Sequence, residues 1–139
     1  MTRTGSAKKV DGAYARGRLA NARSYLQAAR DGFAFAYDGA NLNPVMSLVI
    51  SAAIAYTDAL TASRKSVVNQ QDHSAAVKLL RDALGRDLPA AHERQLRRIL
   101  ADKDAVQYGA SIGRYSEAEK MLADLEEFAA WAERQLLGG

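Results

Sequence analysis

Apolar residues in the first third of the chain recur at alternating steps of four and three, which is the spacing of one face of an α-helix. The pattern predicts a first helix from about residue 13 to residue 36. It ends in residues 37–43, where a glycine and two asparagines are typical of a loop. The inward positions of this helix are Ala15, Leu19, Ala22, Leu26, Ala29 and Phe33.

A second helix is predicted to start at the pair Asn43 and Pro44. Asparagine is a favoured N-cap, and proline suits the first helical position because the N–H that it lacks would have no partner there. From Val45 to Leu60 the chain is apolar around most of the helix circumference. Such a helix is buried on nearly every side, so we expect it at the centre of the fold.

Two further helices are indicated in the next part of the chain. A short one follows the polar residues 69–72, with Asp72 or Ser74 as its N-cap and Gly85 at its end. Another begins after Pro89 and runs to the break at residues 109–113. This helix places Leu96, Ile99, Leu100, Lys103 and Val106 on one side.

The last helix is predicted to open with a capping box formed by Ser116 and Glu119. No alternation typical of β-strands extends over a useful length. We therefore predict an all-α fold, an up-and-down bundle of four long helices plus one short helix. It occupies residues 13–137 as a single domain, behind a flexible basic tail at residues 1–12. The inward positions of the last helix are Met121, Leu122, Leu125, Phe128, Ala129, Ala132 and Leu136.

Composition supports a helical fold and excludes some chemistry. Twenty-eight of the 139 residues are alanine, the best helix former and a poor strand former. The chain has no cysteine, which excludes disulfides and thiolate sites. No apolar stretch follows the basic N-terminus, so we expect no secretory signal.

The most apolar stretch, residues 45–62, has about the length that a membrane-spanning helix needs. It contains Ser47, Ser51, Thr57 and Asp58, and a charge in the middle of a membrane helix is costly. We therefore expect a buried helix in a soluble, cytoplasmic protein with no membrane partner.

Positive charge is concentrated near the N-terminus. The net charge is +3, and residues 1–30 contain seven Lys or Arg against one Asp. Arg16, Arg23 and Arg30 are seven residues apart, so they are nearly aligned on the first helix. Such a stripe could follow a phosphate backbone. It could equally be a solvated face or one that pairs with the acidic last helix, whose carboxylates are Glu117, Glu119, Asp124, Glu126, Glu127 and Glu133.

Familiar catalytic motifs are not found in the sequence. His73 and His92 lie in different segments without a metal-binding spacing, so we expect no metal. There is no nucleophile elbow, Walker A loop or dinucleotide fingerprint, and we expect no cofactor.

Two charged residues interrupt faces that are otherwise built for packing. Asp58 is the one charge within the apolar second helix, and Lys103 lies on the apolar face of the fourth. Each is either an amphipathic residue at the edge of the bundle or part of a polar notch in which the two approach one another. Asp104 and Tyr108 would lie near such a notch.

The order of these segments resembles that of HEPN domains. Residues 51–60 are similar to the Ser-x-x-Ala-x-Tyr-x-Ala-x-x-Ala helix of that family, and residues 72–77 to the His-Ser start of its next helix. Residues 99–108 resemble its Leu-x-x-Arg-x-x-Ala-Asp-Tyr stretch, and residues 116–128 its closing Ser-x-x-Glu-Ala helix. The resemblance covers roughly residues 13–137 and lies in order and spacing.

The resemblance implies a helical bundle, often a homodimer, linked to RNA or nucleotide binding. Many HEPN domains are metal-independent RNases, or toxins paired with a nucleotidyltransferase-fold antitoxin. Their site combines an arginine, which stabilises phosphate charge, with a histidine that acts as acid or base. Here Lys103 stands in place of the arginine and Tyr108 in place of the histidine. Lysine lacks the bidentate fork of arginine, and tyrosine is a poor base at neutral pH, so cleavage is not expected at these positions.

Three functions follow as hypotheses. The leading one is a non-catalytic or degenerate HEPN-like domain, expected as a homodimer, that binds RNA, a nucleotide or a protein partner such as a nucleotidyltransferase-fold protein, in a toxin–antitoxin or defence context. The second is a metal-independent ribonuclease that uses Arg86 and His92, which have the literal arginine-to-histidine spacing although Pro89 lies between them. The third is a purely structural interaction module. For the leading hypothesis the ligand-binding residues are Lys103, Asp104, Tyr108, Asp58, Arg16, Arg23 and Arg30.

Overall fold

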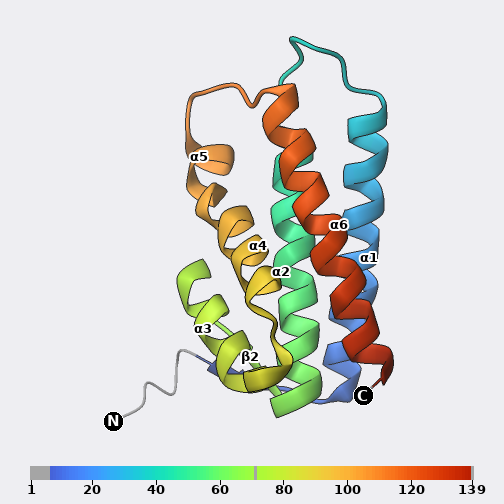
Figure 1. Cartoon of the computed structure of the whole chain (residues 1–139), viewed down its shortest axis with the longest axis vertical. Helices are drawn as coiled ribbons and strands as arrows, with labels where there is room; N and C mark the ends of the chain where they lie inside the picture. Colours follow the sequence, from blue (N-terminus) through green and yellow to red (C-terminus); the bar gives the residue numbers. More distant parts are fainter. Residues whose placement is uncertain (1–6, 71, 139) are drawn as a thin grey trace.

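The computed structural model describes residues 7–70 and 72–138, and most of them belong to helices (Figure 1). The prediction of an all-α bundle is confirmed. A two-stranded sheet of three residues per strand lies beside it. In chain order the elements are β1 (Ala7–Lys9), α1 (Gly12–Ala34), α2 (Asn43–Lys65), β2 (Val67–Asn69), α3 (His73–Leu84), the 3-10 turn η2 (Gly85–Asp87), α4 (Ala90–Ala101), α5 (Lys103–Tyr108) and α6 (Tyr115–Gly138).

Helix α2 is the central helix, as its apolar circumference predicts. It packs against α1 and α6 and also contacts α3, α4 and α5. Its length and its mean hydropathy of 1.6 over 18 residues would allow it to cross a membrane, but 78% of that window is buried inside the bundle. Burial of this extent is typical of the core helix of a folded domain.

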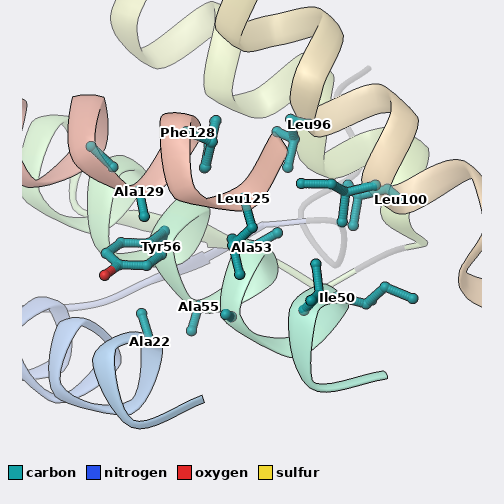
Figure 2. Close-up of a cluster of buried hydrophobic side chains, with 14 of the residues drawn as sticks. Ala22, Ile50, Ala53, Ala55, Tyr56, Leu96, Leu100, Leu125, Phe128 and Ala129 are labelled. Atoms are coloured by element: carbon teal, nitrogen blue, oxygen red, sulfur yellow. The ribbon is translucent and has the colours of Figure 1, made fainter. Parts of the chain in front are cut away.

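The core gathers side chains from both halves of the chain around α2 (Figure 2). Tyr56 of α2 points into the space between Ala22 of α1 and Ala129 of α6. Phe128 and Leu125 of α6 are fully buried next to it. Each large apolar side chain buried in this way contributes about 1.5–3 kcal/mol. The small residues on α1 and α6 let their backbones come close to α2, so the alanine-rich faces determine the spacing of the helices.

The N-terminal segment differs from the sequence-based expectation. Residues 7–9 form β1, which pairs antiparallel with β2, with Lys8 opposite Val68. Asp11 then caps α1, because its carboxylate accepts a hydrogen bond from the N–H of Tyr14 (3.0 Å). The expected mobile tail therefore does not extend over residues 7–12, and residues 1–6 lie outside the described residues. Strands of three residues are too short to show the alternation of apolar and polar residues from which a strand is predicted.

Two helix starts also differ in detail from the prediction. The N-cap position of α2 is Leu42 and Asn43 is already helical. The Asn43 side chain instead donates to the carbonyl of Ser111 (2.8 Å), which ties the start of α2 to the loop before α6. Helix α6 begins at Tyr115, and Glu117, not Glu119, accepts from the backbone N–H of Arg114 (2.9 Å). The capping residues were therefore wrong by one or two positions, while the helices themselves were predicted correctly.

The fourth predicted helix is divided in two at Asp102. Its backbone there (φ −91°, ψ 1°) lies at the edge of the helical region, and α5 continues from Lys103. Aspartate favours such positions because its short polar side chain competes with helical hydrogen bonding. Val106 is still half-buried against the core, so the predicted apolar face continues across the break.

The α1–α2 loop and the α5–α6 loop meet at one end of the bundle (Figure 1). The N–H of Leu42 donates to the carbonyl of Gly113 (2.9 Å), and the N–H of Gly113 to the side chain of Asn41 (3.3 Å). Gly113 is buried, and a Cβ atom there would lie 2.1 Å from the Cε of Met46, 2.5 Å from the Oδ1 of Asn43 and 3.0 Å from the Asn43 backbone N. The close approach of the two loops therefore requires glycine at position 113. The hydrogen bonds between the loops hold them in a fixed position.

Candidate nucleic-acid interface

The arginine stripe of α1 is largely neutralised by α6. Arg23 forms a bidentate ion pair with Glu133 (2.8 and 2.6 Å), and Arg30 forms one with Glu126 (2.7 Å for Nε to Oε2). The hydrogen bonds to these carboxylates raise the pKa of both arginines. Of the three interpretations of the stripe, pairing with the acidic last helix is confirmed for these two residues. Arg16 is exposed and makes no ion pair with a residue that the structure describes.

Tyr56 lies beneath these pairs, at the bottom of a hollow of about 280 Å³ between α1 and α6. Its hydroxyl donates to Glu133 (3.0 Å), and burial, reinforced by this bond, raises its pKa. The hydrogen bond from Arg23 lowers the pKa of Glu133. Every polar group in the hollow is thus already bonded within the fold, which makes the stripe a structural element between α1 and α6.

Asp58 does not meet Lys103. Its carboxylate is bound by the guanidinium of Arg18 on α1 (3.2 Å), while α5 lies on the other side of α2 (Figure 1). Burial raises the pKa of Asp58 to about 6, although Arg18 opposes the rise. The polar notch is therefore not formed, and Asp58 is a buried partner of α1.

Lys103, Asp104 and Tyr108 come together on the short helix α5. The ammonium of Lys103 lies over the Tyr108 ring, 5.6 Å from its centroid, and Tyr108 is 77% exposed. Asp104 is exposed beside them. These residues form a surface group that is separate from the α1 stripe and from Asp58.

His92 and Arg86 occupy different surroundings. The ring of His92 stacks on Trp131 at 5.1 Å, and its Nδ1 lies 2.7 Å from the side-chain oxygen of Gln95. Gln95 in turn donates to Glu127 (2.7 Å), so the histidine belongs to a network that joins α4 to α6. Arg86 is exposed on the turn η2. Within the described residues no hydrogen bond or ion pair connects it to His92.

Six cations without a carboxylate partner belong to elements that meet at the end of the bundle where α2 and α6 end (Figure 1). Each is exposed, and none forms an ion pair with a residue in 7–70 or 72–138. We call this group the basic end. It consists of Lys8 and Lys9 of β1, Arg16 of α1, Lys65 of α2, Arg86 of η2 and Arg134 of α6.

Specific contacts join the elements that carry these six residues. The N–H of Val10 donates to the carbonyl of Ser66 (2.9 Å), which places β1 beside Lys65. Arg16 and Ser66 line the same hollow of about 320 Å³.

A second set of bonds attaches η2 and the end of α6. Arg64 donates to Asp87 of η2 and to Gln135 of α6, at 2.9 Å each. The immediate chain neighbours of its two acceptors are Arg86 and Arg134. Arg64 thus joins the end of α2 to η2 and to the end of α6, the elements that carry Arg86 and Arg134.

The described residues contain no cluster of three or more His, Cys, Asp or Glu side chains that could hold a metal ion. The sequence contained one signal for the basic end, the excess of Lys and Arg before residue 30. That signal could not identify Lys65, Arg86 or Arg134, because they reach this end through tertiary contacts. Comparison with models of known protein families and with curated proteins found no match.

Proposed function

We propose that this chain is a non-catalytic, HEPN-like helical bundle that binds RNA through the basic end. The observation that carries the proposal is that six exposed, unpartnered cations belong to five elements at one end of the bundle. Cations already held by carboxylates must lose those partners before they can bind phosphate. Free surface cations instead displace the counterions of a nucleic acid directly, and this release drives binding.

The arrangement favours a polymer over a small nucleotide. The six cations are spread over several elements and do not converge on one buried pocket. Such a spread matches successive phosphates of a chain. Leu137 is the one exposed large apolar side chain of the described residues that lies near this end, and it is not aromatic. The bases of a nucleic acid therefore have no exposed ring to stack on there. Binding should therefore follow the phosphate backbone and show little sequence preference.

Binding without cleavage is the expected outcome. The catalytic positions that the HEPN resemblance points to carry Lys103 and Tyr108. The alternative histidine, His92, is stacked on Trp131 and bonded to Gln95. The ribonuclease hypothesis predicts metal-independent cleavage that is lost in His92→Ala, and an assay of both proteins on labelled RNA tests it.

The proposal is tested by measuring RNA affinity for two matched triple variants. One neutralises the basic end by Lys8→Gln, Lys9→Gln and Arg16→Gln. The control removes the same charge at the opposite end by Lys103→Gln, Arg114→Gln and Lys120→Gln. Fluorescence anisotropy with a labelled oligouridylate at low salt should show affinity about tenfold weaker for the first variant and nearly unchanged for the control.

The control also tests the ligand site predicted from the sequence. A loss confined to the variant of Lys103, Arg114 and Lys120 would place RNA at the opposite end of the bundle and contradict the basic end. Equal losses in both variants would show a response to net charge alone. Absence of binding by the unaltered protein at low salt would reject RNA binding and favour the structural-module hypothesis.

A further inference from the structure

The end opposite the basic end exposes apolar side chains. Four of the five large apolar residues that are exposed within residues 7–70 and 72–138 lie in or next to its two loops. We call this group the aromatic end: Phe35 (86% exposed), Tyr37 (70%), Tyr108 (77%) and Ile112 (64%). A concentration of exposed apolar side chains at one place on a folded domain is characteristic of an interaction surface.

This surface rests on a well-fixed base. Beneath it Phe33 of α1 and Tyr115 of α6 pack ring against ring, with centroids 4.7 Å apart. The hydrogen bonds from Leu42 and Asn43 join the α1–α2 loop to the α5–α6 loop. Because the loops are bonded to each other and to the core, they can accept a partner without being ordered first, which lowers the entropic cost of binding.

Neighbouring hollows run between the two loops and along the start of α6. One of about 570 Å³ is lined by Asp38, Ile112 and Arg114, among others. A second of about 550 Å³ shares Arg114 with it and is lined by the ion pair of Arg98 with Asp124 and by Lys120, among others. The aromatic end is therefore concave, with room for side chains of a partner segment.

Carboxylates without a partner outnumber such cations at this end, where Lys103 and Lys120 are the cations that form no ion pair with a described residue. Asp38, Asp102 and Asp104 are exposed and form no ion pair with a described residue. The cation Arg114 is paired with Glu117 (3.5 Å). Lys103 lies over the ring of Tyr108, so an aromatic face at this end already holds a cation. Carboxylates and aromatic faces both attract guanidinium and ammonium groups.

From this combination we infer that the aromatic end docks a segment of a partner protein that is rich in arginine or lysine and carries apolar residues between them. The unpaired carboxylates repel RNA and anionic lipid, and the rings and hollows accept cationic and aliphatic side chains. This surface is independent of the RNA site, because it lies at the other end of the bundle and needs none of the same residues.

Amide NMR mapping with two model peptides tests the inference. The probes are a short peptide of alternating arginine and leucine and its counterpart of alternating glutamate and leucine. The first should give saturable shifts in residues 35–42 and 102–116, and the second none. The triple variant Tyr37→Ser, Asp38→Ser and Tyr108→Ser changes only exposed side chains and should weaken binding at least about tenfold. Leu137→Ser, an equally exposed apolar residue at the other end, is the control and should bind as the unaltered protein does.

Three outcomes would overturn it. The first is an absence of shifts with the cationic peptide, or equal shifts with both peptides. The second is a set of shifts at the aromatic end that grows with protein concentration alone, which would make a second copy of the chain the occupant. The third is a shift of the same residues by oligouridylate. None of these outcomes decides whether RNA binds the basic end.

Discussion

Asp58 offers the clearest test of how burial and charge are balanced in the core. It is 8% exposed within α2, and its carboxylate is held by Arg18 alone among the charged residues described. Burial raises its pKa from 3.8 to about 6, so the folded protein holds the proton more tightly than the unfolded chain does. The substitution Asp58→Asn keeps the shape and removes the titration.

The size of the effect follows from the pKa. Each pKa unit corresponds to about 1.4 kcal/mol, so a rise from 3.8 to about 6 corresponds to about 3 kcal/mol. The stability associated with protonated Asp58 is fully present below pH 4. It is lost as the pH rises through about 6, because the folded state must then bury a charge. Above pH 7 the unaltered protein should therefore be less stable than Asp58→Asn by up to about 3 kcal/mol, and near pH 4 the two should be equal.

Urea unfolding followed by circular dichroism, at a series of pH values from 4 to 8, measures this difference. Other titrating groups contribute equally to both proteins, so subtraction isolates Asp58. A difference that stays constant across this range would refute the reasoning. So would a variant that is less stable at pH 7, since the Arg18 ion pair would then outweigh the cost of burial.

Two further predictions concern packing. Tyr56→Phe removes the hydroxyl that donates to Glu133, and it should lower the free energy of unfolding by about 1–2 kcal/mol. Chemical denaturation measures this change, and an unchanged free energy of unfolding would contradict the hydrogen bond. Gly113→Ala should lower the free energy of unfolding by about 1–3 kcal/mol, because its Cβ would lie 3.0 Å from the backbone N of Asn43 and 2.5 Å from the Oδ1 of that residue, whose side chain is bonded to Ser111. Gly17→Ala is the matched control: nothing lies within 4 Å of its Cβ, so the helix should gain about 1 kcal/mol, and equal effects at both glycines would contradict the close contact.

The helical elements could be predicted from the sequence because the apolar pattern reports directly on burial. The continuous apolar circumference of α2 identified the central helix, and Asp72 and Gly85 at the ends of α3 act as caps as expected. Local signals failed where a distant contact decided the outcome. Asn43 was predicted to cap its own helix and instead binds Ser111, 68 residues away.

The candidate site was harder to predict, for a related reason. The alignment of Arg23 and Arg30 follows from helix geometry, but their pairing with Glu133 and Glu126 depends on how α1 and α6 are rotated in the bundle. Asp58 was correctly identified as an anomaly within an apolar helix, yet its partner is Arg18 and not Lys103. A sequence reports which charges exist, and the tertiary structure decides which of them remain free.

The central claim is that RNA binds the basic end through its free cations, and the salt dependence of binding tests it most directly. Each phosphate contact on a single strand adds about −0.7 to the slope of log affinity against log salt, so six contacts would give a slope of about −4. Neutralising Lys8, Lys9 and Arg16 should bring this slope to about −2, while the matched variant of Lys103, Arg114 and Lys120 should keep the original slope. A slope that the first variant leaves unchanged would contradict the account.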